Sequence, residues 1–199
     1  MPQIVVPFRG ASGKRRLDVP DEFRSQLALA MLGDVLSACV ATGRTILVTG
    51  DGAARALASE FGAELVDDPG GGQGPAVAAA LEHMQVGPVV VLNADLPCVV
   101  PDDVRTLAGM AELGALGLVE AEDGTTNALA LPRASLFAPL YGARSADRFR
   151  AHAEANGVIA VAAAIPNLAD DVDTLEDLTR IGLRAGSRTQ AAIGQLAAL

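Results

Sequence analysis

The stretch PVVVLNADLPCV, residues 88–99, decides how the chain folds. Its residues 89–92 are consecutive and apolar, and three are β-branched valines, which is typical of a strand buried on both faces of a parallel sheet. Pro97 cannot continue a central strand, so we expect the strand to end near Asp95. Ligands bind at the carboxyl ends of strands in open α/β sheets, where a carboxylate can hold a divalent cation against phosphate oxygens. Alternatively, Asp95 is a loop residue that caps the next helix.

Strand-like and helix-like segments alternate on both sides of this stretch. In residues 21–41, for example, apolar side chains recur at the spacing of an amphipathic helix. We therefore predict a single three-layer α/β/α domain over residues 1–199, with a mostly parallel sheet and one antiparallel hairpin. The expected strands are 3–7, 45–49, 63–66, 89 to about 95, 115–120, 128–131 and 158–165, and the expected helices are 21–41, 52–61, 76–85, 101–112, 145 to about 156 and one within 186–199.

The composition limits the functions that are open to the chain. No apolar run approaches the roughly 20 residues that span a bilayer, and the strand-like start IVVPF is not a signal-peptide pattern. The two cysteines, Cys39 and Cys98, form no CxxC pair, so we expect neither a zinc site nor a disulfide framework, and a reducing cytoplasm fits. A net charge of −9 argues against general nucleic-acid binding but allows a nucleotide ligand.

A basic loop with glycines, PFRGASGKRRL at residues 7–17, follows the first expected strand. Glycines such as Gly13 let backbone amides approach an anion closely, and Arg9, Lys14 and Arg16 supply charge that suits phosphate. The loop is not a Walker loop, because Arg15 stands where Ser or Thr is required. A solvated basic loop is the alternative, but the concentration of charge at the start of a βα unit favours phosphate binding.

A second glycine-rich loop, DDPGGGQGP, occupies residues 67–75. Four glycines in five positions cannot form a regular element, so the backbone there either approaches a ligand closely or serves as a flexible connector or lid. Gln73 carries a donor and an acceptor that suit the edge of a base. Gly74 precedes Pro75, which we expect in the first turn of the next helix.

Two polar loops lie further along the chain, DGTTN at residues 123–127 and YGARS at residues 141–145. Thr125, Thr126 and Asn127 are either ordinary turn residues or substrate contacts. Ser145 is expected to be the N-cap of a helix, and a helix N-terminus also binds anions, so the two functions need not compete.

An acidic run, DDVDTLED, covers residues 170–177. Thr174 and Asp177 have the spacing of a capping box. Capping does not explain why Asp170, Asp171 and Asp173 crowd together, since like charges repel unless a cation or a basic group compensates them.

Three features are therefore expected where strands end: the basic loop, Asp95, and the carboxylates near Asp171 and Asp173. Together they suit metal-assisted transfer on a nucleoside triphosphate, in which a cation bridges phosphate oxygens and basic side chains offset charge as pyrophosphate leaves. The sequence shows none of the nucleophile–base pairs of a hydrolase.

The motifs of the chain resemble those of a known enzyme family. VLNADLP and DVDTLEDL resemble the nucleotidyltransferases of the glycosyltransferase-A type, which have a nucleotide-diphospho-sugar transferase-like fold. IVVPF with the downstream KxRL, and above all DGTTNALAL followed by YGARS, resemble the 2-phospho-L-lactate and phosphoenolpyruvate guanylyltransferases of coenzyme F-420 biosynthesis. The resemblance covers nearly the whole chain.

The resemblance implies a reaction, a cofactor and site residues. GTP and phosphoenolpyruvate or 2-phospho-L-lactate would give a guanosine diphospho-linked product and pyrophosphate, with Mg²⁺ held by Asp95 and by Asp171 or Asp173. The other implied contacts are Lys14 and Arg16 to the triphosphate, Gly74 and Pro75 near the base, and Thr126, Asn127, Gly142 and Ser145 to the phosphorylated acid.

Other functions remain to be weighed against this one. A molybdenum-cofactor guanylyl- or cytidylyltransferase would share the fold and Asp95, but the TTNALAL and YGARS pair disfavours it. A non-catalytic nucleotide-binding regulator would not need two metal carboxylates. We expect no nucleic-acid or membrane partner; a downstream transferase would accept the labile product, and the apolar tail would suit a homodimer.

Overall fold

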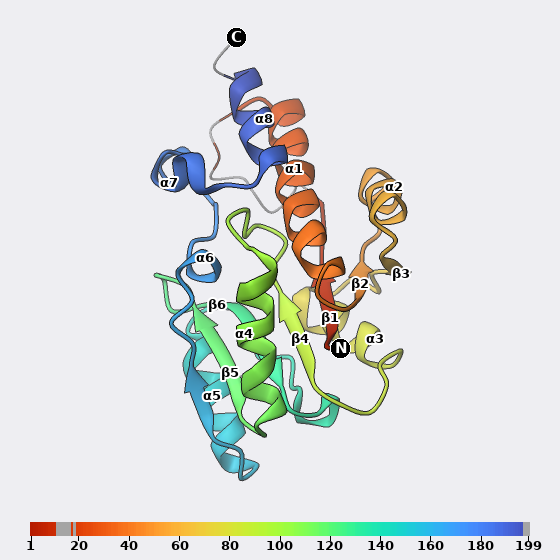
Figure 1. Ribbon diagram of the computed structural model, residues 1–199, viewed down its shortest axis with the longest axis vertical. Coiled ribbons are helices and arrows are strands. Elements are labelled where there is room, and N and C mark those ends of the chain that lie inside the picture. Colours follow the sequence, from red (N-terminus) through yellow and green to blue (C-terminus); the bar gives the residue numbers. More distant parts are fainter. Residues whose placement is uncertain (11–16, 18, 197–199) are drawn as a thin grey trace.

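The computed structural model describes residues 1–10, 17 and 19–196. A seven-stranded sheet runs through the described residues, with helices on both of its faces (Figure 1). The strands are β1 (Gln3–Pro7), β2 (Arg44–Val48), β3 (Glu64–Val66), β4 (Val89–Leu92), β5 (Leu116–Glu120), β6 (Thr126–Leu131) and β7 (Ala160–Ala162). The helices are α1 (Asp21–Val40), α2 (Gly52–Phe61), α3 (Gln73–Leu81), α4 (Pro101–Glu112), α5 (Ser145–Ala155), α6 (Pro166–Ala169), α7 (Leu175–Ile181) and α8 (Ser187–Leu196), with short 3₁₀ turns η2 (Ala134–Leu136) and η3 (Gly182–Arg184).

The strand order, β3-β2-β1-β4-β6-β5-β7, brings the functional loops to one edge. Strands β1 and β4 are parallel neighbours, so the loops at their carboxyl ends lie side by side. Strand β6 is antiparallel to β4, with Leu92 opposite Ala128, so the beginning of β6 reaches the same edge as the end of β4. The structure thus confirms a mostly parallel sheet with an antiparallel element.

The apolar residues of the strands divide between two cores, as the three-layer prediction requires. On one face, Ile4, Val6 and Leu92 pack against α1, α2 and α4. On the other face, Val5 and Val91 pack against α3 and α5. The buried valines of β4 therefore contact helices on both sides, which explains why this strand is continuously apolar.

Several predicted boundaries differ from the observed ones. Strand β4 ends at Leu92 rather than near Asp95, and β7 spans only Ala160–Ala162 because it pairs with β5 alone at the sheet edge and is soon followed by α6. Helix α3 begins at Gln73, before Pro75, because the first amides of a helix have no intrahelical acceptor and a proline is tolerated there.

Helix α1 is long and apolar enough, by length and composition alone, to cross a membrane, although no uninterrupted apolar run in the sequence approaches that length. In the structure it is a core helix, with 61% of its most apolar window buried. Its stripe of Phe23, Leu27, Met31 and Val35 is fully or almost fully buried, as its helical spacing predicts.

A third apolar cluster joins the C-terminal helices to α1. Phe23, Leu27 and Met31 pack with residues of α7 and α8, and Figure 1 shows α8 lying along α1. Asp34 of α1 is 8% exposed, and its carboxylate accepts hydrogen bonds from the backbone amides of Arg188 (3.1 Å) and Thr189 (2.9 Å). A side chain of α1 therefore caps the first turn of α8.

We predict that Asp34→Ala lowers the free energy of unfolding by about 2 kcal/mol, because one buried and one partly buried backbone amide lose a charged acceptor. Thermal or urea unfolding measures this change. Asp21→Ala, which removes a carboxylate on the same helix that is 94% exposed, should cost less than about 1 kcal/mol. Equal losses in the two variants would contradict the capping role of Asp34.

Candidate active site

Two neighbouring cavities lie at the carboxyl edge of β1 and β4. The first has a volume of about 260 Å³ and the second about 340 Å³. Gln73, Asn93 and Asp173 line both of them, so the two cavities meet at these side chains. The arrangement suits two ligands that are brought together at one point.

The first cavity is built from the loop after β1, the loop after β4 and one side of α1. Phe8, Ala28 and Met31 form an apolar part of its lining, and Arg9 and Asp95 form a polar part. Gly10 and Gly72, both with positive φ, stand close by, and a Cβ on Gly72 would lie 3.5 Å from Nη1 of Arg9. This cavity offers an apolar surface together with the cationic side chain of Arg9.

The second cavity lies between the β5–β6 hairpin and the loop before α5. Its lining is mainly polar, with the residues Gln73, Asn93, Asp123, Thr125, Thr126, Tyr141, Gly142, Ser145, Asp171 and Asp173. The Ser145 hydroxyl donates to Thr126 Oγ1 at 3.0 Å, which joins the two loops. Burial raises the pKa of Tyr141, so its phenol stays protonated even well above neutral pH.

Three carboxylates from distant segments gather at the junction. Asp95, Asp171 and Asp173 are half-buried, and each offers an oxygen within 4.8 Å of the others. Val172, between the two acids of the C-terminal segment, is fully buried, and its amide donates to the Asp95 carbonyl at 3.2 Å. Because neighbouring side chains of an extended segment point to opposite sides, burial of Val172 turns both flanking acids toward the cleft.

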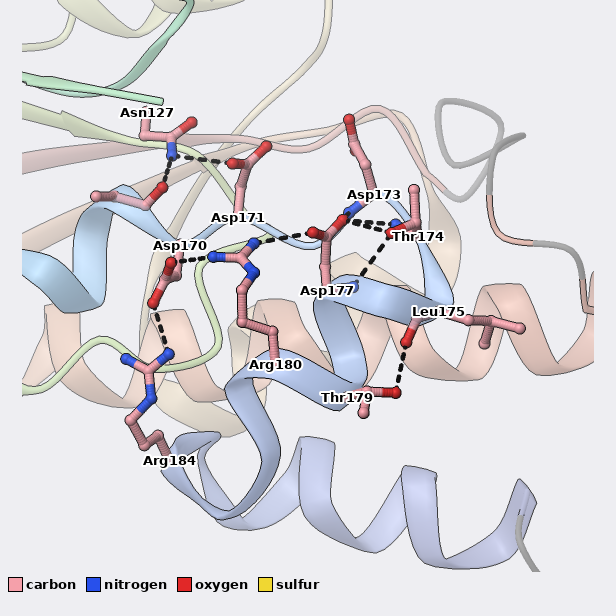
Figure 2. A network of polar contacts seen from close by, with 11 residues as sticks. Asn127, Asp170, Asp171, Asp173, Thr174, Leu175, Asp177, Thr179, Arg180 and Arg184 are labelled. Carbon is pink, nitrogen blue, oxygen red and sulfur yellow. Dashed lines mark hydrogen bonds and ion pairs between the residues drawn. The ribbon is translucent and has the colours of Figure 1, made fainter. Parts of the chain in front are cut away.

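Two arginines hold the fourth acid of this region away from the group. Asp170 forms ion pairs with Arg180 of α7 and with Arg184 (2.6 Å), and Figure 2 shows Asp170 turned toward them while Asp171 faces Asn127. The crowding of acids in the sequence is therefore partly a structural ion-pair network, and only Asp171 and Asp173 join Asp95.

The predicted capping box at the start of α7 is confirmed. The Asp177 carboxylate accepts hydrogen bonds from the backbone amides of Asp173 (3.0 Å) and Thr174 (2.8 Å). Burial opposes ionisation of Asp177, but the hydrogen bonds from Arg180, Asp173 and Thr174 outweigh it and lower its pKa to about 2. An ionised Asp177 thus fixes the backbone that carries Asp173.

The structure brings together most of the residues that the sequence singled out. Arg9, Gln73, Asp95, Thr126, Gly142, Ser145, Asp171 and Asp173 line the two cavities. Gly13, Lys14 and Arg16 lie outside the described residues.

Gly74, Pro75 and Asn127 do not line either cavity, although the resemblance implies ligand contacts for them. Gly74 is buried against Pro139, where a Cβ would lie 2.5 Å from the Pro139 Cβ, so its glycine is required for packing. Asn127 is 1% exposed, and its side-chain amide donates to the Ala169 carbonyl and to Asp171 Oδ1. Ser145 is not the N-cap of α5 as predicted: Arg144, with φ +54°, occupies that position, and the Ser145 hydroxyl bonds to Thr126 instead.

Several lining residues escaped the sequence analysis. Asn93 lies beside Asp95 in the same motif, and its position at a strand end was the available signal. Asp123 and Tyr141 lie in loops whose neighbours were singled out, but nothing in the sequence separates them from ordinary turn residues. Phe8 was assigned to the basic loop and Met31 to the core stripe of its helix, and only the fold shows that both line a cavity.

Comparison with known proteins identifies the class. The model of the MobA-like NTP transferase domain matches residues 22–170, so the chain is a nucleotidyltransferase. Proteins named phosphoenolpyruvate guanylyltransferase are 33% identical in Geodermatophilus obscurus, over 89% of this chain and 83% of the relative, and 34% identical in Streptomyces scabiei, over 97% of this chain and 96% of the relative. The chain belongs to this family of guanylyltransferases.

Solved structures support the same fold. A protein from Desulfovibrio desulfuricans G20, thought to be a nucleotide-diphospho-sugar transferase, superposes with a TM-score of 0.79 at 16% identity, over 99% of this chain and 95% of the other. A molybdopterin-guanine dinucleotide biosynthesis protein A from Archaeoglobus fulgidus has a TM-score of 0.56 at 19% identity, over 89% and 95%. At these identities the likeness concerns the fold.

We predict that Gly74→Ala lowers the free energy of unfolding by about 1–3 kcal/mol, because the new methyl group overlaps Pro139. Gly109→Ala, in open space on α4, should instead stabilise the protein by about 0.5–1 kcal/mol. Melting temperatures measure the two effects, and we expect a decrease for Gly74→Ala and an increase for Gly109→Ala. A stable Gly74→Ala protein would remove the packing explanation.

Proposed function

We propose that the protein transfers GMP from GTP to the phosphate of a three-carbon acid, phosphoenolpyruvate in the first place, with Mg²⁺. An oxygen of the acceptor phosphate attacks the α-phosphorus of GTP. The bond between the α-phosphorus and the oxygen bridging to the β-phosphate breaks, and pyrophosphate leaves. The product is a guanosine diphospho-linked acid.

The observation that carries the proposal is the meeting of two cavities at a group of carboxylates. The larger apolar surface of the first cavity suits a nucleoside, and Arg9 suits its phosphates. The second cavity offers hydroxyl and amide groups to a small polar acceptor. Their common border at Gln73, Asn93 and Asp173 is where the acceptor phosphate and the α-phosphate would meet.

The three carboxylates fit Mg²⁺. They provide hard oxygen ligands, and Mg²⁺ is typically held by one or two carboxylates together with substrate phosphates. When bound, the ion withdraws charge from the phosphate oxygens and orients them for in-line displacement. Asp95 and either Asp171 or Asp173 would hold it, as the family resemblance implies.

The other residues would bind and orient the two substrates. Arg9, together with Lys14 and Arg16, would offset the charge of the triphosphate as pyrophosphate departs. The Thr126 hydroxyl would donate to the phosphorylated acid, and Ser145, which donates to Thr126 Oγ1, would orient that hydroxyl, with Gly142 allowing a close approach by its backbone. Catalysis would then rest on positioning and charge, without a protein nucleophile.

The names of the relatives favour phosphoenolpyruvate as the acceptor, and 2-phospho-L-lactate is the alternative. A product with a phosphoric anhydride next to an enol ester is labile, so a downstream transferase is expected to consume it. The proposal extends to coenzyme F-420 biosynthesis, in which the resembling family acts, and to a cytoplasmic location.

Pyrophosphate release tests the proposal. We expect release from GTP and Mg²⁺ with phosphoenolpyruvate, and less or none with 2-phospho-L-lactate or 3-phosphoglycerate supplied singly. Asp95→Asn should lower the rate by about 100-fold or more, because metal stabilisation of the transition state contributes several kcal/mol. Asp102→Asn, which changes an 88% exposed carboxylate on α4, should leave the rate unchanged.

Release with none of the three acids, even with a product-consuming enzyme present, would overturn the acceptor assignment and direct the search to pterin phosphates. Omission of Mg²⁺ must abolish turnover in the unaltered protein. Full activity of Asp95→Asn would refute the carboxylate site and favour a nucleotide-binding regulator.

A second prediction concerns the acceptor. Ser145→Ala should raise the KM for phosphoenolpyruvate by about ten-fold, because the Thr126 hydroxyl loses the donor that orients it toward the charged acid, while the KM for GTP changes by less than about two-fold. Ser135→Ala, an exposed hydroxyl in η2, is the matched control. A parallel rise in both KM values would contradict the assignment of the second cavity to the acceptor.

A further inference from the structure

Asn127 is a buried amide at the beginning of β6 that neither cavity exposes. Its side-chain nitrogen donates to the Ala169 carbonyl at 3.1 Å and to Asp171 Oδ1 at 3.2 Å (Figure 2). Both partners are acceptors, so the amide can take only this orientation, since a flipped group would place oxygen against oxygen. The Asn127 side chain thus holds both the last residue of α6 and one carboxylate of the group of three.

The same amide is the last of three hydrogen-bonded amides, of which the first two, Gln73 and Asn93, line both cavities. Gln73 Nε2 donates to Asn93 Oδ1 at 2.6 Å, and Asn93 Nδ2 lies 3.5 Å from Asn127 Oδ1 and donates to the Thr126 carbonyl at 3.2 Å. Every amide in the series donates in the direction of Asp171. Aligned hydrogen bonds polarise one another, so the donor that faces Asp171 is strengthened.

We propose that Asn127 is a positioning residue that fixes the Asp171 carboxylate for metal binding without touching a substrate. The segment that carries Asp171 is also held by the ion pairs of the preceding residue, Asp170, with Arg180 and Arg184. These contacts hold the acidic segment, residues 170–173, between the sheet and α7, and the hydrogen bond from Asn127 acts directly on the Asp171 carboxylate. Partners that orient a metal ligand typically affect metal affinity about 10- to 100-fold.

The inference rests on the proposed function, and a direct metal measurement separates the two. Mn²⁺ binding to the purified protein, followed by electron paramagnetic resonance of the free ion, needs no substrate and no turnover. We expect Asn127→Ala to weaken Mn²⁺ binding by about 10- to 100-fold. In pyrophosphate release, raising the metal concentration should restore kcat in Asn127→Ala but not in Asp171→Ala.

Asn167→Ala is the matched control. Its amide donates to Asp103 Oδ2 at 3.0 Å, an amide–carboxylate bond of the neighbouring α6 that does not involve the three carboxylates. We expect unchanged Mn²⁺ affinity there. Asn127→Leu, which keeps the buried volume but removes the donor, serves as a second variant in case Asn127→Ala does not fold.

The outcomes are distinct. No Mn²⁺ binding by the unaltered protein would overturn the metal assignment and this inference with it. Binding by the unaltered protein, with equal affinity in the folded Asn127 variants, would overturn this inference alone. A lowered melting temperature with unchanged metal affinity would show that Asn127 serves only the stability of the fold.

Discussion

The pairing of β6 with β4 is the constraint on which the site depends. The backbone amide of Asn93 donates to the Asn127 carbonyl at 3.0 Å, which continues the antiparallel ladder past the end of β4. A parallel strand in this position would bring its carboxyl end to the edge and leave its beginning at the far side of the sheet. Because the strand is reversed, Thr126 enters the second cavity and Asn127 reaches Asp171. A shift of one residue in this register would exchange their directions.

The gathering of three carboxylates opposes folding, and the surrounding structure offsets this cost. Like charges within a few ångströms repel, and partial burial increases the repulsion. The protein assigns the remaining acids of the region to other partners: Asp170 to two arginines and Asp177 to the start of α7. Buried Val172 supplies apolar contact between the two acids that remain in the cleft. The contacts of the C-terminal segment thus offset the repulsion among three carboxylates that are held close together in the cleft.

The sequence predicts the layers and the edge of the sheet well, because periodicity and proline positions report directly on local backbone structure. Helices 52–61 and 101–112 have the expected bounds, and Gly62 ends α2 in the left-handed conformation. The motifs also indicate that Asp95, Asp171 and Asp173 belong together. The directions of side chains are harder to predict from the sequence. Asn127 was expected to contact a ligand, but its side chain donates to Asp171. Gly74 was expected to be a loop glycine, but it is packed against Pro139. Such roles depend on contacts between segments far apart in the chain, which no local pattern encodes.

The cap that Asp34 provides for α8 has a consequence for the synthesis of the protein on the ribosome. The contact joins residues 155 positions apart, so α8 can pack on α1 only after almost the whole chain has been synthesised. The sheet can be completed once β7 has emerged from the ribosome. Phe23, Leu27 and Met31 are covered only later, when α7 and α8 pack against them. The nascent chain therefore passes through a stage in which an ordered sheet carries an open apolar patch, the type of surface that chaperones bind. Asp171 and Asp173 are fixed at the same late stage, so the group of three carboxylates is among the last parts of the molecule to form.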